Sequence, residues 1–522
     1  MSAIIFKIFI YLLDDNLLFH TELRQLTMEK ELLKYLKSSI IRDWLTCYSS
    51  DLESNQESKD KFFSSRLLYQ LTQAKMQRIT NFAVTESVKP AVFVVENNPV
   101  DFTAAFLAGV ITETDIFLCD PNWQQQEWQQ VLKLVQPDIV FANQAIKFSI
   151  LKSAGYSQTK SGSVSNTDIN VSGASIMIPT GGTSGKIRFA IHNWSTLTAS
   201  VSGFARFFSC SNINSFCTLP LYHVSGLMQL MRSLLTQGNL VVCPYKLLAS
   251  KSIELDTSKY FISLVPTQLQ YLLEHVPGWL KEFKTVLVGG AAASPSLLAV
   301  AREQKIPVSL IYGMTETASG VVALKPQDFL KGNNSSGKVL PHARISINHE
   351  RSQNVPQKAE AELSFDRRGS IQIASDSLCL GYYSELSTPV ASLVTDDLGY
   401  FDAEGYLHLI GRDSQKIITG GENVYPIEVE AAICATKLVQ DVLVLGIPDA
   451  KWGEAVTAFY VPSNSADDLS LIKQQGKLGL AKYKQPKNWI KVDYIPRNNR
   501  GKVNYQQLKA IAIKAINKSS NL

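Results

Sequence analysis

Short apolar runs that stop at glycine, proline or a polar residue recur along this chain, with helix-forming stretches between them. The run Ala91-Val-Phe-Val-Val95 is typical of a buried strand leading into a turn. Similar runs begin at Ser263, Thr285 and Val308, and helical stretches cover 102–110 and 269–275. Alternating strands and helices favour a mostly parallel sheet, which binds ligands beyond the carboxyl ends of its strands. The sequence therefore predicts an α/β fold whose functional residues follow Gly-rich strand ends.

The chain is too long for a single compact core. Domains usually stop growing at about 250–300 residues, and this sequence has 522. After Gly411 a polar, Gly-bearing stretch interrupts the pattern, and a new βα pattern then runs to the C-terminus. We predict a large N-terminal domain over 28–411, with mostly parallel sheets flanked by helices, and a small α+β C-terminal domain over 415–522. Because Met28 is in frame, residues 1–27 are a possible N-terminal extension.

Charge and cysteine usage argue against several classes of partner. The net charge of +5 is spread over 51 basic and 46 acidic residues without a dense basic stripe, so we expect no nucleic-acid partner. The seven cysteines are scattered and form no C-x-x-C pair, which favours neither a disulfide framework nor a zinc site and fits a reducing cytosol. The apolar N-terminal run is too short to span a bilayer, so we expect no integral membrane association.

The strongest local signal is a Gly-rich loop after a strand-like run, Thr180-Gly-Gly-Thr-Ser-Gly-Lys186. Glycines let successive backbone N–H groups point at one anion, the hydroxyls add donors and Lys186 adds positive charge, so the loop suits a polyphosphate. It is not a P-loop of the GxxxxGK[ST] type, because the glycine spacing is one residue short and Ile187 replaces the magnesium-binding hydroxyl. A loop of this composition, taken alone, is more often an ordinary turn.

Three further motifs follow in order: Tyr312-Gly-Met-Thr-Glu-Thr317, Thr395-Asp-Asp397 and Gly411-Arg-Asp-Ser414. Together with the loop and Arg500-Gly-Lys502, they resemble the acyl-adenylate-forming superfamily, which includes acyl-CoA synthetases, firefly luciferases and peptide-synthetase adenylation domains. The resemblance runs from about residue 90 to about residue 510. It implies an AMP-forming acid–thiol ligase that uses ATP, Mg²⁺ and CoA. It also implies that the small C-terminal domain is mobile about a hinge at 412–414.

The resemblance implies a role for each matched residue. The residues implied to be catalytic are Lys502, Thr315, Glu316 and His223, with Glu316 as the Mg²⁺ ligand. Those implied to bind ATP are Thr180, Gly181, Gly182, Thr183, Ser184, Gly185, Lys186, Gly289, Gly290, Ala291, Tyr312, Gly313, Met314, Thr315, Asp397 (ribose) and Arg412. Gly420, Gly421 and Glu422 would lie beside CoA, and Ser414 would be the hinge residue. Structural alternatives remain open: Glu316 could cap a helix, Asp397 could belong to a turn, and Lys502 could be a solvated surface charge.

Two motifs depart from the usual family pattern. Thr395-Asp396-Asp397 stands where the family usually has Thr-Gly-Asp. In the Gly-rich loop the usual Pro and final Gly are missing, while Arg188 keeps the charge of the usual lysine.

The segment from Leu219 to Arg232 resembles the family's acyl-pocket lining. The implied substrate-binding residues are His223, Ser225, Gly226, Arg232 and Gly289. Arg232 is the most informative, because it lies in an otherwise apolar helical stretch, where a buried charge is costly unless it meets a partner. A second carboxylate on the substrate would be such a partner. A protein carboxylate, or a charge that reaches solvent, is the alternative.

His223-Val-Ser-Gly226 with an arginine at this spacing resembles the 2-succinylbenzoate–CoA ligases of menaquinone and phylloquinone biosynthesis. The altered Gly-rich loop is similar to that of their cyanobacterial or plastid branch. The resemblance implies that 2-succinylbenzoate, ATP and CoA give 2-succinylbenzoyl-CoA, AMP and pyrophosphate, in the cytoplasm or in a plastid stroma. The alternatives are another aryl- or acyl-CoA ligase, an adenylation enzyme that loads a carrier protein, and a non-catalytic nucleotide-binding relative.

Overall fold

The computed structural model describes residues 43–48, 61–62, 65–143, 146, 173–181, 186–249, 253, 255–348, 368–385, 391–463, 470–472, 480–497 and 503–520. These residues fall into two compact units. The first unit covers the described residues within Met1–Leu45, Phe62–Trp194 and Tyr382–Leu386, and the second those within Thr46–Lys61, Ser195–Gly381 and Ser387–Leu522. The possible N-terminal extension lies outside the described residues, and the domain limits at 411 and 415 stay predictions.

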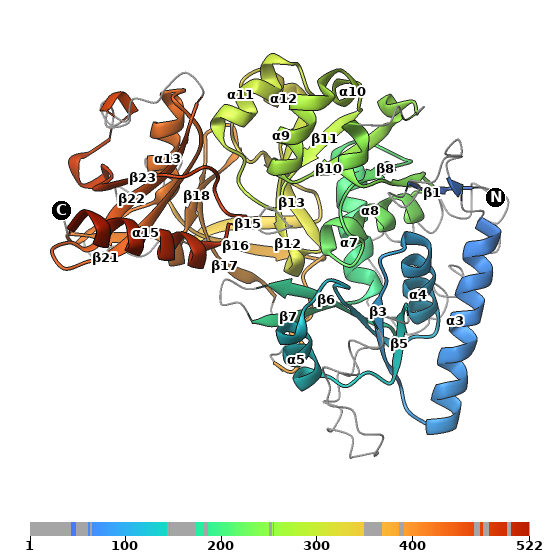
Figure 1. Ribbon diagram of the computed structural model, residues 1–522. Helices are drawn as coiled ribbons and strands as arrows, with labels where there is room; N and C mark the ends of the chain where they lie inside the picture. The colour runs from blue at the N-terminus through green and yellow to red at the C-terminus, as the bar shows by residue number, and fades with distance from the viewer. Residues whose placement is uncertain are drawn as a thin grey trace, which may run out of the picture. The chain divides into compact units, whose positions relative to one another are not determined.

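A five-stranded sheet in the order β5-β3-β4-β6-β7 forms the centre of the first unit (Figure 1). Its strands are β3 (Ala91–Val95), β4 (Asp115–Leu118), β5 (Ile139–Ala142), β6 (Ser175–Gly181) and β7 (Ile187–His192). All neighbours pair in parallel except β7, which is antiparallel to β6. The predicted apolar strand at Ala91 is therefore confirmed as a central strand of this sheet.

Three helices belong to this unit: α3 (Ser65–Glu86), α4 (Pro99–Ile111) and α5 (Gln125–Leu134). The turn after β3 starts α4, because Asn98 Oδ1 accepts hydrogen bonds from the first backbone N–H groups and Pro99 has the φ that a first helical residue needs. On α5, Trp128 packs in one core with Phe93 and Phe117 of the sheet. The predicted helix at 102–110 lies within α4.

The second unit contains a nine-stranded sheet in the order β14-β13-β12-β11-β10-β8-β9-β1-β2. Its strands are β1 (Leu45–Cys47), β2 (Lys61–Phe62), β8 (Asn214–Cys217), β9 (Leu240–Val242), β10 (Tyr260–Leu264), β11 (Thr285–Val288), β12 (Val308–Met314), β13 (Ser319–Ala323) and β14 (Lys338–Val339). Strands β9, β8, β10, β11 and β12 pair in parallel with their neighbours in this run. The helices are α7 (Trp194–Phe207), α8 (Val224–Leu235), α9 (Pro266–His275), α10 (Pro277–Lys281), α11 (Pro295–Glu303) and α12 (Pro326–Leu330). The apolar runs at Ser263, Thr285 and Val308 fall in β10, β11 and β12, as predicted.

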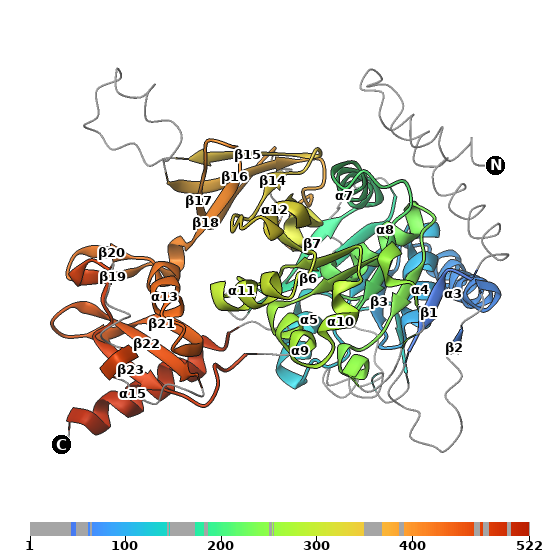
Figure 2. The same cartoon turned by 90° about the horizontal axis from the view of Figure 1, so that it is seen from above.

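A four-stranded antiparallel sheet follows, which the sequence did not predict. It consists of β15 (Ala343–Asn348), β16 (Gly369–Ser375), β17 (Leu393–Phe401) and β18 (Leu407–Arg412), side by side in chain order (Figure 2). Alternate residues of β15 are exposed, because one face of this strand is solvated. Such a strand lacks the continuous apolar run of a buried parallel strand.

The C-terminal sheet has the order β20-β19-β22-β21, with β23 beside β22. It consists of β19 (Ile417–Thr419), β20 (Glu422–Val424), β21 (Val439–Asp449), β22 (Gly453–Pro462) and β23 (Asn488–Lys491), with helices α13 (Pro426–Ala435) and α15 (Tyr505–Ser520). Val442 and Val444 of β21 pack in a core with α13, whereas Leu443 and Leu445 pack in a core with α15. Period-2 alternation of a strand buried on both faces explains this division. The predicted fold class, α/β with a smaller α+β module at the C-terminus, is confirmed.

Within the described ranges, no helix combines the length and the apolar character needed to cross a membrane.

Candidate active site

The carboxyl ends of the parallel strands carry most of the predicted site residues of the second unit. His223 lies in the turn between β8 and α8, Gly289 follows β11 directly, and Thr315 follows β12 directly. Because β8, β10, β11 and β12 are parallel neighbours, their carboxyl ends lie at one edge of the sheet. The structure therefore brings these residues to the edge where an α/β fold binds ligands.

Glycine is required on structural grounds at two of the predicted positions. A Cβ atom on Gly289 would lie 2.9 Å from the carbonyl oxygen of Ile311 on the neighbouring strand. A Cβ atom on Gly226, in α8, would lie 2.1 Å from the carbonyl oxygen of Pro220. Close packing of backbones accounts for both glycines, so their proposed ligand contacts stay predictions.

Asp397 is held by two partners from different strands. The hydroxyl of Tyr312, on β12, donates to Asp397 Oδ2 at 2.9 Å, and Nε of Arg412 donates to Oδ1 at 3.1 Å. Asp397 and Arg412 are direct register partners of β17 and β18. Burial and the charge of Asp397 raise the pKa of Tyr312, so its hydroxyl stays a neutral donor. The carboxylate is thus held by two donors and is mostly buried, and Arg412 is the more exposed of the two donors.

Glu316 lies in a tight turn, η3 (Thr315–Thr317), and is buried. The backbone N–H of Cys379 donates to the carbonyl oxygen of Glu316 at 2.8 Å, and Thr317 Oγ1 accepts from the backbone N–H of Met314 at 3.0 Å. No group of three or more His, Cys, Asp or Glu that could hold a metal ion occurs in the part of the chain that the structure describes. A single carboxylate fits a magnesium ion that arrives with nucleotide phosphates, since Mg²⁺ is usually held by one or two carboxylates plus phosphate and water.

Arg232 is buried in the last turns of α8 without a carboxylate partner among the described residues. Its guanidinium carbon lies 4.0 Å from the ring centroid of Phe204, and Nη2 donates to Ser319 Oγ at 3.3 Å. Its Nε has no hydrogen-bond partner in the described structure. Burial lowers the pKa of Arg232 to about 10, so the side chain keeps its charge at neutral pH. A buried cation with an unused donor suits an anionic ligand group.

His342, which sequence reasoning missed, lies near Arg232. Burial, and then the charges of Arg232 and Arg206, lower the pKa of His342 to about 4, so the imidazole is neutral at pH 7. Neither ring nitrogen has a hydrogen-bond partner among the residues described. The ring packs against Gly203 of α7, where a Cβ atom would lie 1.8 Å from Nδ1. A lone histidine between two strands carries no sequence pattern, so only the fold could reveal this neighbour.

The backbone of Ala318 and Ser319 is strained beside Arg232. Both residues have positive φ, 48° and 88°, a conformation that is unfavourable for residues other than glycine. Ser200 Oγ donates to the carbonyl oxygen of Ala318 at 2.7 Å and helps hold the turn. The strain places Ser319 Oγ within reach of Arg232.

In the C-terminal module, an exposed indole stands beside the predicted Gly420-Gly421-Glu422 segment. The backbone N–H of Gly420 donates to the carbonyl oxygen of Trp452 at 2.8 Å, and a Cβ atom on Gly420 would lie 3.0 Å from the indole. Lys451 Nζ and Lys487 Nζ lie 5.2 Å and 4.9 Å from the indole centroid. Two ammonium groups beside an aromatic face suit a phosphorylated ring compound. The sequence pattern did not indicate Trp452 or Lys487.

Several predicted residues cannot be placed. Gly182, Thr183, Ser184, Gly185 and Lys502 lie outside the described residues. The strands on either side of the Gly-rich loop are paired, with Gly181 opposite Ile187. Arg188, on β7, lies with its guanidinium carbon 4.0 Å from the ring centroid of Tyr382 and 3.8 Å from a carboxylate oxygen of Glu385.

Two family models match this chain. The model described as AMP-binding enzyme matches residues 69–383, and the model described as AMP-binding enzyme C-terminal domain matches residues 428–502. Among similar curated proteins, a 2-succinylbenzoate–CoA ligase of Enterococcus faecalis is 35% identical over 340 residues, which cover 63% of this chain and 68% of that protein. One from Listeria monocytogenes is 35% identical over 350 residues, which cover 64% and 69%.

Solved structures share the fold over nearly the whole chain. An o-succinylbenzoate CoA synthetase from Bacillus subtilis, in complex with its acyl-adenylate intermediate, has a TM-score of 0.71 at 24% identity and covers 92% of this chain and 97% of that one. The amide bond synthetase McbA from Marinactinospora thermotolerans has a TM-score of 0.72 at 20% identity and covers 92% and 99%. At these identities the similarity establishes the fold alone.

Proposed function

Because the chain belongs to the AMP-binding enzyme family, we propose that it is an AMP-forming ligase that joins 2-succinylbenzoate to CoA. A carboxylate oxygen of the acid forms a bond to the α-phosphorus of ATP, and the bond to the pyrophosphate oxygen breaks. The sulfur of CoA then attacks the acyl carbonyl carbon, AMP leaves with its oxygen, and the thiol proton passes to solvent. The products are 2-succinylbenzoyl-CoA, AMP and pyrophosphate.

The single observation that carries the choice of acid is the unpaired buried charge of Arg232. The guanidinium has no carboxylate partner among the described residues, and its Nε is unused. A substrate with one carboxylate at the reacting end and a second one here would neutralise it, whereas a monocarboxylic acid would leave it buried and uncompensated. Ser319 Oγ and the neutral His342 are additional polar groups for the same carboxylate. The curated relatives named as 2-succinylbenzoate–CoA ligases support this substrate.

For ATP, the proposal assigns ribose binding to Asp397 and the approach to the α-phosphate to Thr315. Both oxygens of Asp397 already accept hydrogen bonds, so a ribose hydroxyl would replace or join Arg412, the more exposed of its two partners. Glu316 would hold the Mg²⁺ ion, which neutralises phosphate charge when bound. Positioning and fixed charge supply most of the barrier reduction in such displacements at phosphorus. The Gly-rich loop and Lys502 would complete the phosphate contacts.

For the acceptor, the group formed by Trp452, Lys451 and Lys487 favours CoA over a carrier protein. A carrier protein presents a thiol without a terminal nucleotide, whereas CoA ends in an adenine ring and a phosphate. The exposed indole and its two ammonium groups match both features. A cytoplasmic or plastid-stromal location is part of the proposal, supported by seven cysteines that are free of disulfides in this structure.

The test is AMP release by the purified protein with ATP, Mg²⁺ and CoA, using 2-succinylbenzoate, benzoate, a coumarate and a medium-chain fatty acid. We expect turnover with 2-succinylbenzoate alone, and Arg232→Ala should lower kcat/KM by about 10²- to 10³-fold because a charged pair is lost in a buried site. Arg66→Ala, which removes an exposed arginine of α3, is the matched control and should stay within about twofold. Turnover of the monocarboxylic acids that is insensitive to Arg232→Ala would refute the proposed substrate.

A further inference from the structure

The C-terminal module joins the rest of the chain through one short segment. Strand β18 ends at Arg412 and β19 begins at Ile417, and every strand and helix of the C-terminal sheet lies after that point in the sequence. Any rotation of the module must therefore change backbone angles within 412–416. Side-chain bonds to this segment set how easily it rotates.

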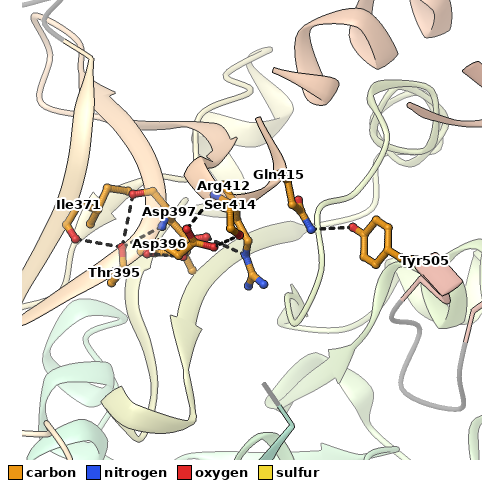
Figure 3. Close-up of polar contacts among 9 residues, drawn as sticks. Ile371, Thr395, Asp396, Asp397, Arg412, Ser414, Gln415 and Tyr505 are labelled. Carbon is orange, nitrogen blue, oxygen red and sulfur yellow. Dashed lines mark hydrogen bonds and ion pairs between the residues drawn. The ribbon is translucent and has the colours of Figure 1, made fainter. Parts of the chain in front are cut away.

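Asp396 holds the central residue of this segment with both carboxylate oxygens. Its Oδ1 accepts a hydrogen bond from the backbone N–H of Ser414 at 3.0 Å, and its Oδ2 accepts from the Ser414 hydroxyl (Figure 3). Asp396 is the residue that departs from the usual Thr-Gly-Asp pattern. A glycine there would offer no side chain, so this chain has a contact that the usual pattern cannot make.

The strand that carries Asp396 is itself fixed. Thr395 Oγ1 donates to the carbonyl oxygen of Ile371 on β16 at 2.9 Å and accepts from the backbone N–H of Asp397 at 3.2 Å. The next residue, Asp397, is tied to Tyr312 and Arg412. The carboxylate of Asp396 is therefore presented from a rigid support, which limits the entropy lost when it binds Ser414.

The other side of the segment is tied to the C-terminal module. Gln415 Nε2 donates to the hydroxyl of Tyr505 at 2.9 Å (Figure 3), and Tyr505 is the first residue of α15. Consecutive residues, Ser414 and Gln415, thus bind β17 and α15 respectively. A rotation of the module that kept both bonds would be confined to the backbone bonds between Ser414 and Gln415.

We propose that Asp396 is a positioning residue that restrains segment 412–416 by holding Ser414, and so sets the balance between adenylation and thioester formation. The proposal rests on the proposed function in assigning a half-reaction to each arrangement. Its structural part, that Asp396 restrains segment 412–416, does not depend on which acid is the substrate.

The first measurement is limited trypsin cleavage after Arg412 and Lys416 under native conditions. Cleavage requires local opening of the segment, so Asp396→Ala should be cut about three- to tenfold faster than the natural protein, as for loss of one or two hydrogen bonds. Ser414→Ala keeps the backbone hydrogen bond to Asp396, so its cleavage rate should lie between those of Asp396→Ala and the natural protein. Glu404→Gln, which changes an exposed acid in the β17–β18 turn, is the matched control and should cleave at the natural rate. Equal cleavage of Asp396→Ala and the natural protein would overturn the proposal.

The second measurement compares the half-reactions: pyrophosphate exchange for adenylation, and thioester formation from preformed acyl-adenylate. Asp396→Ala should change the ratio of the two rates by about three- to tenfold, with the KM for ATP unchanged. Equal effects on both rates would mean that Asp396 has a merely structural role and would overturn the positioning role. If the natural protein exchanges no pyrophosphate with 2-succinylbenzoate, the proposed function fails while the cleavage result still decides whether Asp396 holds the segment.

Discussion

At the scale of single residues, the contacts around Asp397 show how the candidate site is organised. Tyr312 comes from one sheet and Arg412 from another, and both donate to the same carboxylate. The carboxylate therefore has a fixed orientation, and a nucleotide would not have to order it on binding. Pre-ordering of this kind raises affinity by lowering the entropy lost in the complex.

Tyr312→Phe tests this organisation. Loss of the hydroxyl leaves Asp397 Oδ2 without its 2.9 Å donor, so we expect the KM for ATP to rise about three- to tenfold and the free energy of unfolding to fall by about 1 kcal/mol. Pyrophosphate-exchange kinetics and thermal unfolding measure the two effects. Tyr400→Phe is the control, because Tyr400 lies on the same strand as Asp397 but stacks on His408. A lower kcat with an unchanged KM would instead place Tyr312 in the chemical step.

The sequence pointed to candidate site residues far better than to their neighbours in space. Arg232, Asp397 and Glu316 were predicted because motifs point to them, and their roles stay predictions. The proximity of His342 and Ser319 to Arg232 was not predictable, because it depends on how α7, α8 and two β-strands pack. Residue identity is a local property of the sequence, whereas proximity in space is a property of the tertiary fold.

At the scale of elements, we expect the turn between β21 and β22 to act in CoA binding, separately from the large sheet. Trp452 lies there, against the backbone of Gly420. We expect Trp452→Ala to raise the KM for CoA about tenfold, because stacking on a base is worth about 1–3 kcal/mol, while pyrophosphate exchange stays unchanged. Tyr494→Ala, which removes another exposed aromatic side chain of this module, is the control. An unchanged KM for CoA would exclude the indole from the acceptor site.

Which elements were predictable depended on their burial. Strands β10, β11 and β12 lie inside a parallel sheet, and their buried residues make apolar runs that end in a clear break. Strand β15 was missed because alternate residues face solvent, so it lacks such a run. The hydrogen bonds between Asp396 and Ser414 were also not predictable from the sequence. They depend on where the β17–β18 pairing ends rather than on either strand alone.

At the scale of the whole molecule, two ionisable groups whose pKa values are shifted by burial make stability depend on pH in opposite directions. Burial lowers the pKa of His342 to about 4 from 6.5, so its protonation favours the unfolded chain as pH falls through that window. Burial raises the pKa of Glu430 to about 7 from 4.5, so its ionisation favours the unfolded chain as pH rises through that window. Each shift corresponds to about 3 kcal/mol in full.

Because His342 and Glu430 lie in different parts of the fold, calorimetry should separate their effects on thermal unfolding. On lowering the pH from about 7.5 to about 5.5, we expect the transition of the C-terminal module to move to higher temperature and that of the larger part to lower temperature. Glu430→Gln, whose amide oxygen can still accept the 2.8 Å hydrogen bond from the Val444 N–H, should abolish the first shift only. Parallel shifts of both transitions in the natural protein would contradict the assignment.

The C-terminal sheet has helices of its own on both faces and a core on each face. Segment 412–416 contributes no residue to these two cores, and besides its restraint by Asp396 it is the covalent link that keeps the module close to the rest of the chain. A short tether gives an effective concentration of the order of millimolar. The covalent link thus keeps the local concentration of the module high. If the chain were cut there, the activity of the two pieces would fall on dilution, as in any pair of dissociable subunits.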